Sequence, residues 1–211
     1  NYFELYELGR GKRFNPARHV PLGGRSGFSA DALALRGALR FDPAQVRRFV
    51  ASGAWGADTL PGWLAARADA APASAALLDA AGALSYAEMH AQALRLAAGL
   101  HALGIGRGDV VAVQLPNRRE LLVVYCAIAR IGAVLSTACM SYRDADLRAL
   151  LAHSRARALV CLAQTKDYAP AQVVLAMKAQ LPALEHVIAL GGAPQGAVEY
   201  GSLATRDAPL P

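Results

Sequence analysis

Few residue patterns that support catalysis occur in this chain of 211 residues. No glycine-rich run is followed by Lys and then Ser or Thr, so a Walker A loop is absent. The sequence also has no GxSxG elbow and no HExxH pair. The five histidines are scattered singly, and Cys126, Cys139 and Cys161 have no CxxC spacing. We therefore predict no metal site and no catalytic residue, and interpret the cysteines as buried free thiols.

Two further patterns have the wrong context for chemistry. Gly104, Gly106 and Gly108 follow a predicted helix and precede a predicted strand, whereas a dinucleotide-binding loop follows a strand and opens a helix. Asp144 and Asp146 are two positions apart, so on a helix their side chains do not face each other. The first pattern indicates a helix-to-strand connection, and the second makes a carboxylate dyad improbable.

The stretch GDVVAVQLPNRRELL, residues 108–122, joins a predicted strand to a predicted helix. Ligands of α/β proteins often lie at such junctions. Pro116 has no amide donor and ends strand pairing, while Asn117 is expected to cap the helix with Glu120 at position N3. We therefore interpret this turn as structural.

The elements that must position any site alternate between helix and strand from residue 85 onward. Ser85 and Glu88 form the sequence pattern of a capping box, and Gly104 is placed to end that helix. Leu60, Trp63 and Leu64 are expected on one side of an earlier helix. Strands are predicted at 74–86 (a pair), 110–115, 133–138, 157–162 and 186–190, and helices at 60–72, 85–103, 117–131, 141–152 and 170–181. This order predicts an α/β fold, a parallel sheet flanked by helices.

Charge separates the chain into two parts. Residues 1–48 hold nine Lys and Arg against four Asp and Glu, a net of +5, and the remainder holds 13 against 12. We assign residues 1–39 to a basic Gly/Arg-rich arm or linker. No uncharged apolar run reaches 18 residues and no signal-peptide pattern is present, so we predict no membrane span and a cytoplasmic location. Without a recognisable reading element, nucleic-acid binding is not expected.

Three stretches, in order, resemble adenylate-forming acyl- and aryl-CoA ligases. They are GAWGADTLPGWLAARADAAP at 53–72, GALSYAEMHAQALRLAAGLHALGIGRGDVVAVQLPNRRE at 82–120 and CAIARIGAVLSTACMSYRDADLRALLAHSRARALVC at 126–161. The resemblance covers about residues 40–205 and implies the N-terminal part of the large domain of that fold. It implies a reaction in which a carboxylate and ATP give acyl-AMP, from which CoA then takes the acyl group. ATP, Mg²⁺ and CoA are therefore expected for the full-length enzyme, with a carboxylic acid as its substrate.

Other motifs of that family do not occur in this sequence. Missing are its Ser/Thr/Gly-rich phosphate loop ending in Pro-Lys-Gly, its Tyr-x-x-Thr-Glu block, its ribose-binding Asp and its catalytic Lys. The resemblance thus assigns residues 40–211 to an incomplete N-terminal subdomain that ends before the phosphate loop. We expect this fragment to be inactive alone and to bind no cofactor tightly.

The resemblance also implies one local site. In acyl-CoA ligases, the loop after the GAV strand can lie near the CoA nucleotide, and here it contains Cys139, Met140, Ser141 and Arg143. A helix starting at Ser141 would offer free amides to a phosphate. The alternative is a plain capped turn.

Two other functions stay open. The chain could be a non-catalytic, degenerate ligase-like interaction module, or part of an aryl-acid adenylating enzyme that loads a carrier protein. A parallel sheet separated from the rest of such a domain also predicts self-association through exposed sheet.

Overall fold

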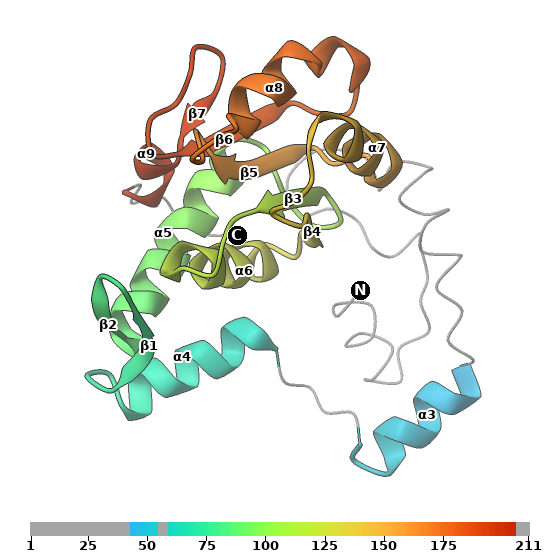
Figure 1. The fold of residues 1–211 in the computed structure, drawn as a ribbon. Coiled ribbons are helices and arrows are strands. Elements are labelled where there is room, and N and C mark those ends of the chain that lie inside the picture. The colour runs from blue at the N-terminus through green and yellow to red at the C-terminus, as the bar shows by residue number, and fades with distance from the viewer. Residues whose placement is uncertain (1–42, 55–58, 206–211) are drawn as a thin grey trace.

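The computed structural model describes residues 43–54 and 59–205, so the predicted arm at 1–39 lies outside the described residues. The described part of the chain starts with helices α3 (Pro43–Ala51) and α4 (Leu60–Ala70) and an antiparallel hairpin, β1 (Ala75–Asp79) and β2 (Gly82–Ser85). The elements that follow alternate: α5 (Tyr86–Ala102), β3 (Val110–Gln114), α6 (Arg119–Arg130), β4 (Val134–Thr137), α7 (Asp144–Ser154), β5 (Ala158–Leu162), α8 (Pro170–Ala176), the 3₁₀ turn η1 (Lys178–Gln180), β6 (His186–Leu190), β7 (Val198–Glu199) and α9 (Tyr200–Ala204) (Figure 1).

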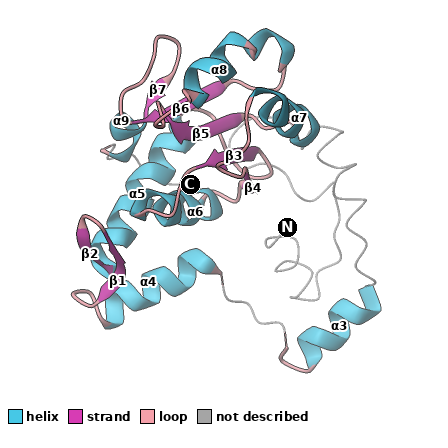
Figure 2. Cartoon of the chain, in the orientation of Figure 1, coloured by secondary structure: helices cyan, strands magenta, loops and turns pink. Residues whose placement is uncertain are grey.

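The central sheet has five strands, all parallel, in the order β4-β3-β5-β6-β7 (Figure 2). Helices join β3 to β4, β4 to β5 and β5 to β6, so these parallel strands are connected by crossovers, whereas residues 191–197 join β6 to β7 without a helix. The predicted fold class, a parallel α/β sheet flanked by helices, is confirmed. Strand β7 and helix α9 were not predicted, because each is too short to give a periodic pattern.

Helices cover both faces of the sheet, and the strand residues alternate between them (Figure 1). In β5, Ala158 and Val160 pack with α5 and α6, while Leu159 and Cys161 pack with α7 and α8. All four side chains are buried. A strand enclosed on both sides needs a continuous apolar run rather than an alternating one, which is what β3, β5 and β6 contain.

Helix α5 is the long helix of the first face, and its local signals were read correctly from the sequence. Ser85 caps it, the backbone N–H of Ser85 donates to Glu88 at 2.8 Å, and the capping box is complete. Gly104 has a φ of 81°, the left-handed conformation that ends a helix and favours glycine. The predicted stripe is buried at Met89, Ala93, Leu96 and Leu100.

Helix α9 packs closely on α5 at Gly99. A Cβ added at Gly99 would lie 2.7 Å from the backbone oxygen of Leu203, closer than real Cβ atoms approach. The Nε of Arg95 donates to the carbonyl oxygen of Ala204 at 3.0 Å beside this contact. The absence of a side chain at Gly99 therefore allows α9 to pack directly against α5.

Helix α4 and the hairpin lie outside α5 and α6 (Figure 1). The Nε of Arg119, at the start of α6, donates to Asp79 at 2.9 Å and so ties the hairpin to that helix. Of the three residues expected on one side of α4, Leu64 is buried, but Leu60 and Trp63 are exposed. Both exposed residues belong to the first turn of α4.

One ion-pair cluster closes the amino ends of the strands. The guanidinium of Arg157 donates to Asp109 at 2.7 Å, to Glu185 at 2.8 Å and to the carbonyl oxygen of Gly104 at 2.6 Å. The hydrogen bonds to Glu185, and then that to Asp109, raise the pKa of Arg157. The Gly104–Gly108 run is therefore a helix-to-strand connection held by this arginine, as its position in the sequence indicated.

Within the described ranges, no helix combines the length and the apolar character needed to cross a membrane. Helices cover both faces of the sheet. The surface that stays open to the predicted self-association is therefore the two sheet edges, formed by the outer strands β4 and β7.

Candidate functional site

The strand order places a topological switch point between β3 and β5. The chain passes from β3 outward to β4 and then returns across β3 to β5, which lies on the other side of β3. At such a point the loops that leave the carboxyl ends of neighbouring strands diverge, and α/β proteins often bind ligands there. The candidate site is therefore the carboxyl-edge cluster, made by Gln114, Cys139, Ser141, Arg143 and Tyr168.

Gln114 is the buried centre of this cluster. Its side-chain Nε2 donates to the carbonyl oxygens of Cys139, at 2.9 Å, and Tyr142, at 3.1 Å. These two acceptors fix the orientation of the amide, because only its nitrogen can donate. The residue is 1% exposed, and its Oε1 has no hydrogen-bond partner within the described residues. Gln114 thus fastens the β4–α7 loop to the end of β3.

The Cys139 thiol lies on the surface of that loop. The hydroxyl of Ser141 donates to its Sγ at 3.1 Å, and this hydrogen bond lowers the pKa of Cys139. Burial instead raises the pKa of Cys126 to about 11 and that of Cys161 to about 12. All three are free thiols, as predicted, but the prediction that they are buried is wrong for Cys139, which is exposed. Hydrogen bonding therefore favours the thiolate at Cys139, the form that acts as a nucleophile.

Arg143 joins the loop after β4 to the loop after β5. Its Nη1 donates to the carbonyl oxygens of Met140, at 3.0 Å, and Tyr142, at 3.2 Å. Its guanidinium lies over the ring of Tyr168, 4.7 Å from the ring centroid, and 3.7 Å from Asp167. With 45% of its side chain exposed, Arg143 can still offer donors to an anion.

The hydroxyl end of Tyr168 is fixed by a hydrogen bond. Its hydroxyl donates to Asp144 at 2.9 Å. Burial, and then this hydrogen bond, raise the pKa of Tyr168 to about 12, so the phenol stays neutral and keeps its donor role. The face of Tyr168 thereby stays in place beneath the Arg143 guanidinium.

The predicted helix start at Ser141 is wrong. Helix α7 begins at Asp144, with Arg143 as its N-cap residue, and the backbone N–H of Arg143 donates to Asp146 at 3.2 Å. The side chain of Asp146 therefore supplies the acceptor at this helix start. With two carboxylates in the first turn of α7, the charge that could meet a phosphate here is the Arg143 guanidinium rather than the helix amides.

The predicted Asn117 cap is also wrong. Helix α6 begins at Arg119, and its N-cap residue Arg118 makes no capping hydrogen bond through its side chain. Glu120 pairs with Arg118 at 2.9 Å instead of completing a capping box. The backbone N–H of Arg119 donates to Asp79 at 3.2 Å, so a carboxylate of the hairpin supports this helix start.

Of the four residues predicted for a nucleotide loop, Cys139, Ser141 and Arg143 join the cluster through side chains and Met140 through its carbonyl oxygen. Sequence reasoning missed Gln114 and Tyr168 as members. A signal existed for Gln114, since it is the polar residue in the apolar run VVAVQ. Over residues 43–54 and 59–205, no group of three His, Cys, Asp or Glu side chains lies close enough to hold a metal ion.

A parallel α/β sheet with a polar cluster at its switch point is typical of ligand-binding α/β proteins. Comparison with known families is more specific, because the family model described as "AMP-binding enzyme" matches residues 64–209. The chain belongs to the AMP-binding enzyme family, and its resemblance to adenylate-forming ligases is confirmed.

Known relatives agree with this assignment. The salicyl-AMP ligase / salicyl-S-ArCP synthetase of Mycobacterium tuberculosis is 35% identical over 196 residues, covering 90% of this chain and 32% of that protein. A 2-hydroxy-7-methoxy-5-methyl-1-naphthoate–CoA ligase of Streptomyces carzinostaticus is 33% identical over 144 residues, covering 68% and 26%. The apo structure of Mycobacterium smegmatis MbtA has a TM-score of 0.75 and 31% identity, covering 87% of this chain and 33% of that one. The chain thus spans about a quarter to a third of the length of these relatives.

Proposed function

We propose that this chain is the N-terminal part of an ATP-dependent carboxylic acid–CoA ligase. A carboxylate oxygen attacks the α-phosphorus of ATP, forming acyl-AMP and releasing pyrophosphate. The thiol of CoA then attacks the acyl carbonyl carbon, forming the thioester and releasing AMP, with Mg²⁺ offsetting phosphate charge in the complete enzyme. The observation that carries the proposal is the family match over residues 64–209.

The isolated chain is expected to be inactive, because its sequence holds neither the phosphate loop nor the catalytic Lys of the family. The test is carboxylate-dependent ATP–pyrophosphate exchange by the 211-residue protein, with salicylate and octanoate as acids. We expect no exchange above background. Exchange that depends on added acid would overturn the view that this part is inactive alone.

Arg143 is proposed to contact a phosphate of the CoA nucleotide. Its support is an exposed guanidinium that Tyr168 and two loop carbonyls hold at the carboxyl edge of the sheet. In the longer protein that the proposal requires, Arg143→Ala should raise the KM for CoA about tenfold and leave the KM for the acid unchanged. Arg148→Ala, which removes an exposed arginine on α7, is the matched control. An unchanged KM for CoA in Arg143→Ala would remove this assignment.

A second candidate is an aryl-acid adenylating enzyme that loads a carrier protein. The relative named salicyl-AMP ligase / salicyl-S-ArCP synthetase favours it, since its match extends over 90% of this chain. The longer protein would be supplied with salicylate, ATP and either CoA or a phosphopantetheine-bearing carrier. Thioester on the carrier but not on CoA would support this candidate against the first.

A third candidate is the non-catalytic interaction module. Sequencing the gene beyond the codon for Pro211 separates it from the other two. A reading frame that continues into a Ser/Thr/Gly-rich loop ending in Pro-Lys-Gly supports the enzyme, and a stop codon supports the module.

For self-association through a sheet edge, the measurement is sizing chromatography, in which a monodisperse monomer would contradict the prediction.

A further inference from the structure

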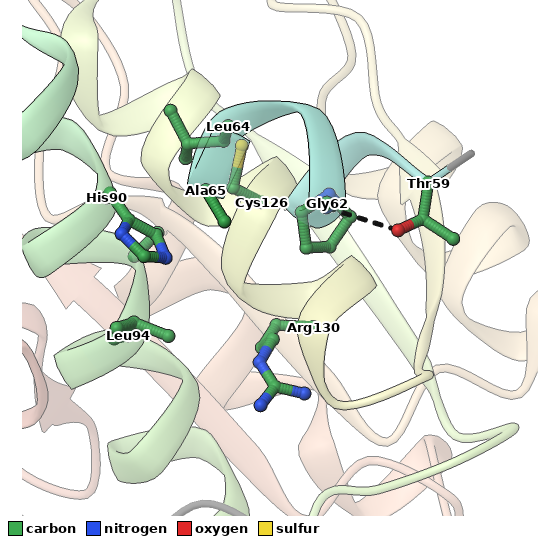
Figure 3. A pocket seen from close by; sticks show the side chains of 10 residues that line it. Thr59, Gly62, Leu64, Ala65, His90, Leu94, Cys126 and Arg130 are labelled. Atoms are coloured by element: carbon green, nitrogen blue, oxygen red, sulfur yellow. Dashed lines mark hydrogen bonds between the residues drawn. The ribbon is translucent and has the colours of Figure 1, made fainter. Parts of the chain in front are cut away.

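A second hollow lies among helices α4, α5 and α6, and shares no residue with the carboxyl-edge cluster. Its volume is about 460 Å³, within the roughly 300–1,000 Å³ of small-molecule sites. Its apolar wall includes Leu64 and Ala65 of α4 and Ala93 and Leu94 of α5 (Figure 3). An apolar group that enters this hollow would bury surface against three helices.

The polar groups at this hollow favour negative charge. Arg130, at the end of α6, and His90, on α5, both line it; Figure 3 shows the His90 ring turned toward the space beneath α4 and Arg130 at the opposite rim, with its guanidinium extending away from α4. Across residues 43–54 and 59–205, no Asp or Glu lines the hollow. In the same ranges, no ion pair or hydrogen bond engages the side chain of Arg130. A guanidinium without a counter-charge beside an apolar wall is complementary to a small molecule with an apolar body and one anionic group.

Two hydrogen-bond donors extend this complementarity. The hydroxyl of Thr59 accepts from the backbone N–H of Gly62 at 3.1 Å, which leaves its own proton free to donate. The imidazole of His90 carries at least one N–H in either protonation state. Both residues line the hollow with Arg130, so up to three donors surround one space.

We propose that this hollow binds a small aromatic or aliphatic carboxylate, with the carboxylate on Arg130 and the apolar body against α4 and α5. The proposed carboxylate site needs no ATP and no further part of a ligase. Binding at this site can therefore be tested independently of the proposed reaction.

The test is calorimetric titration of the 211-residue chain with three probes. Benzoate carries both features, benzamide keeps the ring without the charge, and inorganic phosphate keeps the charge without the ring. We expect saturable binding of benzoate, and we expect benzamide and phosphate each to bind at least about tenfold more weakly than benzoate. Equal binding of benzamide or of phosphate, or no saturable binding of benzoate, would overturn the proposal.

Variants then locate the site. Arg130→Gln removes the charge but keeps a polar side chain, and should weaken benzoate binding about tenfold. Ala65→Phe fills the hollow from α4 and should abolish binding. Arg67→Gln removes an exposed arginine of α4 outside the hollow and should change nothing. Benzoate binding that is unchanged in Arg130→Gln and Ala65→Phe, with both variants folded by circular dichroism, would place the ligand elsewhere and overturn the proposal.

Discussion

The amino and carboxyl ends of the parallel strands are held together in different ways. At the amino ends, Arg157 is 9% exposed, and its guanidinium engages two carboxylates and one carbonyl oxygen. At the carboxyl ends, Gln114 is more deeply buried, at 1% exposed, but its Oε1 has no partner within the described residues, and Cys139 is exposed. The first arrangement satisfies the charges it buries, as a structural cluster should. The second leaves polar groups with unused capacity, which is what a ligand site requires.

The sharpest test of this difference is Arg157→Ala. It leaves Asp109 and Glu185 without their shared counter-charge in a partly buried position, so we expect the free energy of unfolding to fall by about 3 kcal/mol. Urea unfolding followed by circular dichroism measures it. The control Arg148→Ala removes a single exposed hydrogen bond to Gln180 and should cost less than about 0.5 kcal/mol. A loss below about 1 kcal/mol for Arg157→Ala would contradict the structural role of the cluster.

At the other end, Gln114→Leu should cost less, about 1–2 kcal/mol. It removes two hydrogen bonds to the β4–α7 loop, but also the Oε1 that has no partner. The loop itself should loosen, so the amide of Tyr142, which donates to Cys139 at 3.0 Å, should exchange faster with deuterium. Unchanged exchange at Tyr142 would show that Gln114 does not hold the loop.

The thiols give a third comparison, measured as a rate. In the folded protein at pH 7.5, iodoacetamide should modify Cys139 well before Cys126 and Cys161, because only Cys139 is exposed and has a lowered pKa. The reactive thiolate of Cys139 forms as the pH rises through that lowered pKa. Ser141→Ala removes the hydroxyl that lowers it, so the pH–rate curve should move to higher pH and the rate at pH 7.5 should fall severalfold. Equal rates for wild type and Ser141→Ala would exclude the role of that hydrogen bond.

The smallest effect is expected for Asn117→Ala, also at the carboxyl edge. Asn117 caps no helix, so the free energy of unfolding should change by less than about 0.5 kcal/mol. Ser85→Ala, which removes an observed cap, should cost about 1 kcal/mol and serves as the positive control. A cost for Asn117→Ala equal to that of Ser85→Ala would restore the cap that the sequence predicted.

These two residues also show which parts of the fold could be predicted. The partners of Ser85 lie three residues away, so its capping box was visible as a local pattern. The start of α6 depends on Asp79, 40 positions from Arg119, and no local pattern reports that contact. The order of helices and strands was predictable because each long element has its own hydrophobic periodicity. Strand β7 and helix α9 are too short to show such a periodicity.

The site follows the same rule. The family resemblance implied Arg143, Ser141 and Cys139 together, because they lie in the one loop that follows the GAV strand. Gln114 was missed because its acceptors lie 25 and 28 positions away. Tyr168 meets Asp144 across 24 positions, and both reach the cluster only through the strand order. Contacts between loops are set by the sheet, so the residue types in any one loop could not predict them.

The close packing of α9 against Gly99 affects how this protein folds during its synthesis. Arg95 and Ala204, which meet beside that contact, are 109 positions apart in the chain. At a synthesis rate of about 5–20 residues per second, α5 emerges from a ribosome roughly 5–20 s before its partner exists. During that interval the α5 surface around Gly99 is uncovered and accessible to a chaperone. The rate of translation, rather than the speed of helix formation, therefore sets how long this nascent chain needs protection.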